Sequence, residues 1–90
     1  MMKLRLDIKP REHIARYVFG SAIYSDTPSD IDVAIIYDRR YVSVEDAIAY
    51  RRELVNEMSV LNSMMIDAIL LSMEEEMEMA FLENAKCLEF

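Results

Sequence analysis

Two nearly uninterrupted apolar runs constrain the fold of this chain more than any other feature. They read "DIDVAIIY", Asp30 to Tyr37, and "MMIDAILLS", Met64 to Ser72. Short runs rich in Ile, Val and Leu are typical of strands that are covered on both faces, at the centre of a sheet. The sequence therefore predicts two core strands, each of which carries aspartate within or next to its apolar residues.

Three further strands are expected around these two. Residues 2–8 alternate strictly between apolar and charged side chains, which predicts a half-buried strand with one face in water. Residues 14–19, "IARYVF", are rich in β-branched and aromatic side chains and end at Gly20, the one glycine of the chain. The final residues, "CLEF", can add a short edge strand.

Two helices are expected to cover the sheet. Ser43 and Asp46 match an N-cap pattern, and the apolar residues that follow recur at helical spacing over about five turns. Ser72 and Glu75 match a capping box at the start of a second helix, with acidic residues in its first turn. The predicted inward face of that helix contains Met73, Met77, Ala80 and Phe81.

This order predicts an α/β (α+β) protein in which helices pack on a small mixed β-sheet. With 90 residues, of which 53% are hydrophobic, we expect one domain over residues 1–90. No apolar run approaches the roughly 18 residues that span a bilayer, and the first residues are charged. We therefore expect no membrane segment, no signal peptide and a cytoplasmic location.

Charge and cysteine content exclude several classes of function. A formal net charge of −7 argues against nucleic acid as a tightly held partner, since neutralising the phosphate backbone of a nucleic acid requires clustered Lys and Arg. The single cysteine, Cys87, cannot form an internal disulfide and has no neighbours with zinc-ligand spacing. The acidic balance is compatible with a basic protein partner or with a site that holds divalent metal.

The stretch around the glycine carries the strongest chemical signal. Gly20 permits close approach of a ligand to the main chain, and Ser21 offers a hydroxyl and an N–H that suit a phosphate. Asp30 and Asp32 alternate along one strand, so both carboxylates project from the same face. Two such charges are favourable together when a cation such as Mg²⁺ lies between them. The alternative is that Asp30 caps the strand and Asp32 faces solvent.

Asp67 is the one charged residue inside the second apolar run. Burying an unpaired carboxylate costs several kcal/mol, so its presence there calls for a reason. If the two core strands are neighbours, Asp67 joins Asp30 and Asp32, and three carboxylates form a two-metal centre for displacement at phosphorus. A solvent-facing Asp67 is the alternative at this point.

The segments "FGS", "SDIDVAII" and "IDAILLS" together resemble the polymerase β-type nucleotidyltransferase superfamily, and the chain is similar in length to its minimal branch. The resemblance runs from about Val18 to Phe90. It implies that Asp30 and Asp32 bind two Mg²⁺ ions. Asp67 would bind the catalytic ion and help to activate the attacking hydroxyl, while Gly20 and Ser21 would hold the β and γ phosphates of an NTP.

The reaction that the resemblance implies is transfer of a nucleoside monophosphate, AMP from ATP, to a hydroxyl of a protein or a small molecule. Minimal nucleotidyltransferases are often encoded beside a helical HEPN-type toxin partner and act as antitoxins, some by attaching AMP to a tyrosine of that partner. We also expect the N-terminal strand to take part in homodimerisation, because part of the sheet would otherwise lack a cover.

Two other functions stay open. The chain can be a binding protein that keeps the fold but not the catalysis and neutralises a toxin or a basic protein by direct contact. The net charge of −7 favours this alternative, as does Ala22, at a position where family members commonly carry arginine. The third alternative is a structural α/β domain in which the acidic residues have no ligand.

Overall fold

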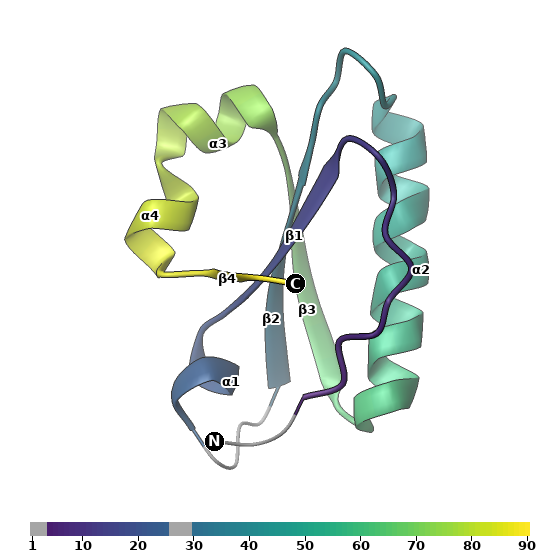
Figure 1. The fold of residues 1–90 in the computed structure, drawn as a ribbon, viewed down its shortest axis with the longest axis vertical. Coiled ribbons are helices and arrows are strands. Elements are labelled where there is room, and N and C mark those ends of the chain that lie inside the picture. Colours follow the sequence, from purple (N-terminus) through teal and green to yellow (C-terminus); the bar gives the residue numbers. More distant parts are fainter. Residues whose placement is uncertain (1–3, 26–29) are drawn as a thin grey trace.

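The computed structural model describes residues 4–25 and 30–90. Its elements follow one another as strands and helices around one sheet (Figure 1). They are β1 (Ile14–Phe19), α1 (Ser21–Tyr24), β2 (Asp30–Tyr37), α2 (Val44–Asn62), β3 (Met65–Ser72), α3 (Met73–Met79), α4 (Phe81–Ala85) and β4 (Leu88–Glu89).

The four strands form a mixed sheet in the order β3-β2-β1-β4. The two apolar runs are direct neighbours, because β2 and β3 pair in parallel, and β1 is antiparallel to both β2 and β4. A parallel pair requires a crossover between its strands, and α2 supplies it. The predicted mixed sheet with packed helices is confirmed, including the short edge strand near the C-terminus. The specific nucleotidyltransferase fold stays a prediction.

The main core lies between α2 and one face of the sheet. Ile31, Val33 and Ile35 point from β2 toward this helix and are fully buried, as are Leu54 and Met58 of α2. Ser43 caps α2 as predicted, since its hydroxyl accepts a hydrogen bond from the Asp46 N–H at 3.1 Å. The α3 and α4 helices lie on the opposite side of the sheet (Figure 1).

The strand predicted over residues 2–8 is wrong in the part that the structure describes. Residues 4–8 form neither strand nor helix, the Ile8 N–H donates to the Leu6 carbonyl at 2.8 Å, and residues 2 and 3 lie outside the described residues. Leu4, Leu6 and Ile8 do turn toward the core, as the alternation predicts. The Arg5 N–H, however, donates a hydrogen bond to the side-chain oxygen of Asn62 at 2.8 Å, and the Asn62 side-chain N–H donates to the Arg5 carbonyl oxygen at 3.0 Å. A helix side chain thus replaces the strand partner. Self-association through this segment stays a prediction.

The predicted inward face of the second helix is confirmed for Phe81, which packs edge-on against Phe19 with 5.2 Å between the ring centroids. It is wrong for Met73 and Met77, which stay exposed. The capping box forms, with the Ser72 hydroxyl accepting from the Glu75 N–H and the Glu75 carboxylate accepting from the Ser72 N–H. The helix nevertheless ends at Ala80, whose left-handed conformation separates α3 from α4. Neither helix buries a residue, and Met77 is 75% exposed. Of the helices formed by the described residues, none combines the length and hydropathy needed to cross a bilayer.

Candidate carboxylate site

Asp30 and Asp32 stand at the beginning of β2 and share one face of the sheet. The intervening Ile31 points toward α2 and is fully buried, so the two aspartates point away from α2. Both side chains are partly exposed. The expected pairing of the two carboxylates on one strand face is therefore present, and the apolar residues between and after them hold β2 in the core.

Asp67 lies beside Asp32. The parallel register of β2 and β3 pairs Asp32 with Asp67 directly, and Asp30 with Met65. Directly paired residues of adjacent strands project from the same face, so all three aspartates lie on the side of the sheet opposite α2. The expectation that Asp67 is a buried charge is wrong: Asp67 is exposed because it lies on the sheet face opposite α2, whereas its neighbour Ile66 points toward α2 and is buried. Among the described residues Asp67 has no ion pair, so solvent stabilises its charge.

Gly20 brings the main chain against the Asp32 carboxylate. Phe19, the last residue of β1, pairs with Asp32 across the ladder. Gly20 then adopts φ 77° and ψ −153°, a conformation nearly restricted to glycine. A Cβ on this residue would overlap an oxygen of Asp32, and the Asp32 Cγ would lie 3.3 Å away. The single glycine of the chain is thus required both by the backbone and by the space that Asp32 occupies.

Ser21 follows as the first residue of α1. Its side chain is exposed, and its carbonyl oxygen accepts a hydrogen bond from the Ser25 N–H at 2.8 Å. The Gly20 carbonyl accepts from the Ile23 N–H at 3.1 Å, which closes the first turn. Ala22 is fully buried in the core and anchors this short helix against the sheet. Anchoring by Ala22 leaves the Ser21 hydroxyl free to face solvent near the start of β2.

The pKa of Asp32 is raised above its usual value of 3.8. Burial is the largest cause, and the like charges of Asp30 and Asp67 add to it. Among residues 4–25 and 30–90, no Lys or Arg forms an ion pair with any of these three aspartates. The three side chains therefore form a region of negative potential that pairs with no cation among the described residues.

An all-oxygen donor set of carboxylates suits a hard divalent cation such as Mg²⁺. The like charges of Asp30 and Asp67 next to Asp32 favour a positive charge at this point. Over the described ranges, however, no group of three or more His, Cys, Asp or Glu side chains is gathered as a ready-made metal cluster. The residue types and their shared face fit the ion, and side-chain rotation would be needed to bring their oxygens to one point.

Comparison with protein-family models, with curated proteins and with solved structures gives no match. The assignment of chemistry to this sheet face therefore depends on the residues themselves.

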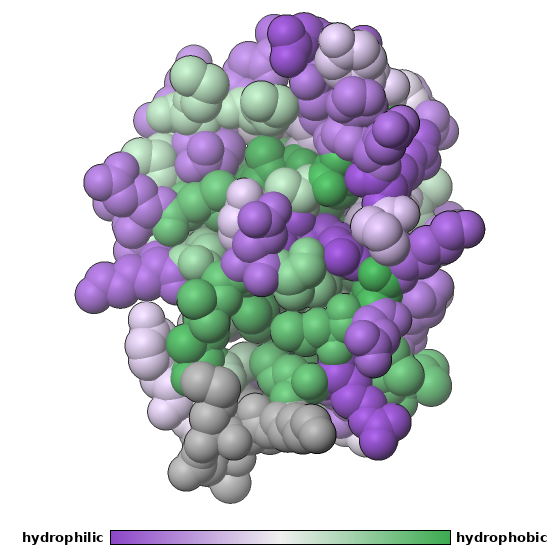
Figure 2. All heavy atoms as spheres, viewed as in Figure 1, coloured by the Kyte–Doolittle hydropathy of each residue, from purple (hydrophilic) through white to green (hydrophobic). Residues whose placement is uncertain are grey.

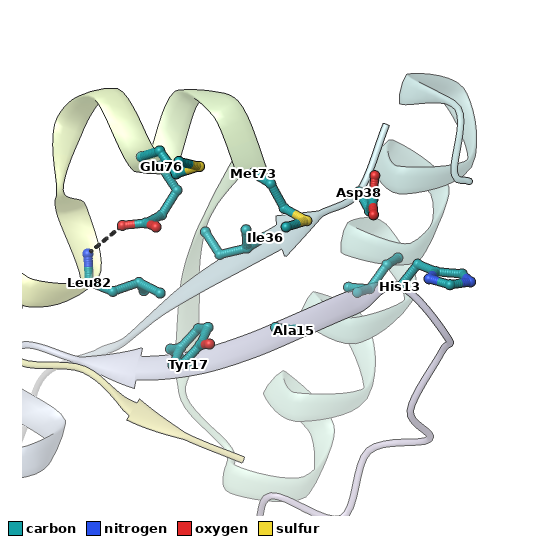
Figure 3. A pocket seen from close by; sticks show the side chains of 10 residues that line it. His13, Ala15, Tyr17, Ile36, Asp38, Met73, Glu76 and Leu82 are labelled. Carbon is teal, nitrogen blue, oxygen red and sulfur yellow. Dashed lines mark hydrogen bonds between the residues drawn. The ribbon is translucent and has the colours of Figure 1, made fainter. Parts of the chain in front are cut away.

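The sequence did not single out a second feature of the same sheet face. A pocket lies farther along β1 and β2, under α3 and α4 (Figure 3). Sequence reasoning assigned Met73 and Met77 to a packed helix face, whereas both line this pocket. The sequence feature that could have indicated the pocket is the run of glutamates in the same helix. One of them, Glu76, lies among the apolar side chains of the pocket and is a candidate ligand-binding group.

Proposed function

We propose that this chain is a Mg²⁺-dependent nucleotidyltransferase that transfers AMP from ATP to a hydroxyl of a protein or small-molecule acceptor, with pyrophosphate leaving. The observation that carries the proposal is the placement of Asp30, Asp32 and Asp67 on one sheet face without an ion pair to a cation among the described residues. Like charges placed together in this way favour a bound metal ion. The motif resemblance supplies the type of reaction.

In this proposal Asp30 and Asp32 hold Mg²⁺ from a strand fixed in the core, and Asp67 approaches from the neighbouring strand. Bound Mg²⁺ supplies charge neutralisation at the phosphates of the nucleotide. Asp67 is exposed, and exposed side chains change rotamer within nanoseconds, so rotation toward Asp32 meets no packing barrier. Asp67 also orients the acceptor hydroxyl for attack.

Gly20 and Ser21 position the phosphates. Gly20, at φ 77°, lets the chain turn directly from β1 into α1 beside Asp32, and the exposed Ser21 hydroxyl at this turn is a hydrogen-bond donor for a phosphate. Catalysis then depends mainly on positioning and on charge neutralisation rather than on a covalent intermediate with the protein.

The alternative is a binding protein that neutralises a partner, such as an HEPN-type toxin, without catalysis. One observation favours it. Members of the family that the motifs resemble commonly carry arginine at position 22, whereas this chain has the fully buried Ala22, which offers no cation to a triphosphate. The net charge of −7 would then serve recognition of a basic partner surface.

The experiment is incubation with ATP labelled on the α-phosphate, with Mg²⁺ and with candidate acceptors that include a co-encoded HEPN-type protein. The Asp30→Asn/Asp32→Asn double variant removes two carboxylates with little change of shape. Asp46→Asn is the matched control, because Asp46 is an exposed aspartate of α2 that pairs with Arg11 at 3.3 Å.

The proposal expects label on the acceptor with the wild type and with Asp46→Asn, and loss of at least about a hundredfold with the double variant. Label transfer that survives in the double variant would contradict it. Neutralisation of a partner by both proteins, without label on any acceptor, would favour the binding alternative.

A further inference from the structure

A pocket of about 420 Å³ opens on the face of the sheet opposite α2. Its floor is formed by strand residues and its roof by α3 and the first part of α4 (Figure 3). The volume falls within the range of small-ligand sites, roughly 300–1,000 Å³. The lining side chains central to the argument are Tyr17, Ile36, Met73, Glu76, Met77 and Leu82.

The methionine side chains of the pocket roof are apolar, but the protein does not bury them. No residue of α3 is buried, and Met73 and Met77 are 42% and 75% exposed. Amphipathic helices normally gain their stability by burying such side chains. Methionine is flexible and polarisable, so it adapts to ligands of irregular shape. Figure 2 shows hydrophobic side chains gathered across the middle of the face that α3 and α4 border.

Glu76 places a carboxylate in this apolar surround. Its Oε2 accepts a hydrogen bond from the Leu82 N–H at 3.3 Å, which holds the side chain between α3 and the sheet (Figure 3). In the part of the chain that the structure describes, Oε1 has no protein donor and Glu76 has no ion pair. The other carboxylate of the pocket, Asp38, is paired with Arg40 at 2.9 Å. The unbalanced negative charge therefore belongs to Glu76.

The neighbours of Glu76 respond to its charge. Burial raises the pKa of Tyr17, and the charges of Glu89 and Glu76 raise it further. Burial also raises the pKa of the Cys87 thiol, again with Glu76 as a contributor. Tyr17 is consequently a neutral phenol at physiological pH, with its ring on the pocket floor. Aromatic rings and carboxylates both attract cations.

We propose that this pocket binds an organic cation with an apolar body, such as an arylalkyl amine. The ammonium group binds Glu76, and the apolar body lies against Ile36, Met73 and Met77. An anion of the same shape is repelled, and a neutral analogue leaves the Glu76 carboxylate partly desolvated without a partner. None of the three aspartates lines the pocket. The pocket lies farther along the same sheet face, since Ile36 is about 13 Å from Asp32 along β2, and Tyr17, which pairs with Ala34, is about 7 Å away. It does not depend on nucleotidyl transfer.

The test is a titration of the full chain, followed by NMR of the methionine methyl groups, with three probes that share one apolar body: phenylbutylamine, phenylbutanol and phenylbutyrate. We expect saturable shifts at Met73 and Met77, and none at Met79, which is exposed on α3 outside the pocket. The amine should bind at least about tenfold more tightly than the carboxylate, with the alcohol between them.

Two variants that each remove one negative charge distinguish binding by the Glu76 carboxylate from general attraction of cations to the acidic helix α3. Glu76→Gln removes the charge but keeps an oxygen for the Leu82 N–H, so the junction of α3 and α4 is preserved. Glu78→Gln removes the same charge from an exposed position of the same helix that does not line the pocket. The preference for the amine should disappear in Glu76→Gln and persist in Glu78→Gln.

Three results would overturn the proposal. One is equal affinity of the wild type for the three probes. Another is an amine preference that survives in Glu76→Gln or is lost equally in Glu78→Gln. The last is the absence of saturable shifts at Met73 and Met77, which would show that the pocket takes no ligand of this class.

Discussion

The carboxylate of Asp32 lies against Gly20, in the space that a Cβ at position 20 would fill. Gly20 directly follows β1 and Asp32 lies on β2, and the antiparallel pairing of Phe19 with Asp32 brings them together. Because position 20 has no side chain, the Asp32 carboxylate can lie against the main chain there. Its position between Asp30 and Asp67 therefore depends on the glycine. The proposed metal site depends on this close approach.

Gly20→Ala should destabilise the protein by about 1–3 kcal/mol from the backbone conformation alone, because φ 77° with ψ −153° is nearly restricted to glycine. The overlap of the new Cβ with Asp32 adds to this loss. Urea unfolding of the two proteins measures the difference. Combining the change with Asp32→Ala should recover part of the loss. Strict additivity of the two changes would contradict the predicted clash.

Asp32→Asn should stabilise the protein at neutral pH. The pKa of Asp32 is raised in the folded state, so folding favours its protonated form and ionisation removes stability. This destabilisation is absent below the unfolded value of about 3.8 and grows as pH rises through the higher folded pKa. The gap in melting temperature between variant and wild type should widen over that window and then stay constant. A gap that is independent of pH would contradict the account.

Arg16 joins the two ends of the described chain. Its guanidinium donates to the main-chain oxygens of Ile8 at 2.7 Å and Phe90 at 3.1 Å, and it lies over the Phe90 ring. Arg16→Met should destabilise the protein by about 1–3 kcal/mol for the buried Ile8 oxygen, with a further loss at Phe90. Arg52→Met, on the exposed side of α2, is the control. Equal unfolding midpoints for the two variants would be evidence against this role.

The capping box of α3 should be needed for the roof of the pocket. Ser72→Ala removes the hydroxyl that accepts from the Glu75 N–H at 3.2 Å, with an expected loss of about 1 kcal/mol. Ser43→Ala, at the cap of α2, should cost a similar amount. Amide hydrogen exchange distinguishes them, because Ser72→Ala should accelerate exchange in α3 without affecting α2. Faster exchange in both helices would show that α3 is not an independent unit.

The strands and caps could be predicted because their signals are local. The apolar runs at β2 and β3, the glycine after β1 and the side-chain caps at Ser43 and Ser72 each depend on residues close in sequence. The shared sheet face of the aspartates could be predicted from the assumption that the two apolar strands are neighbours, because their parallel pairing places Asp67 beside Asp32.

The wrong predictions depended on partners distant in sequence. Strict alternation correctly predicted which side chains of residues 4–8 face the core, but Asn62 took the place of a partner strand. Nothing in the composition of α3 marks the left-handed Ala80 that ends it, so the Met residues were assigned to a longer, packed helix. The exposure of Asp67 follows from its place on the sheet face opposite α2, which depends on how β3 pairs with β2.

The most direct test of the metal site is paramagnetic broadening of backbone amide signals by Mn²⁺ in the presence of ATP. We predict broadening centred on Gly20 and the first residues of β2 and β3, reversed by excess Mg²⁺ and abolished in Asp30→Asn/Asp32→Asn but not in Asp46→Asn. Broadening centred instead on the glutamates of α3, or broadening that the double variant retains, would contradict the assignment of this sheet face as a metal and nucleotide site.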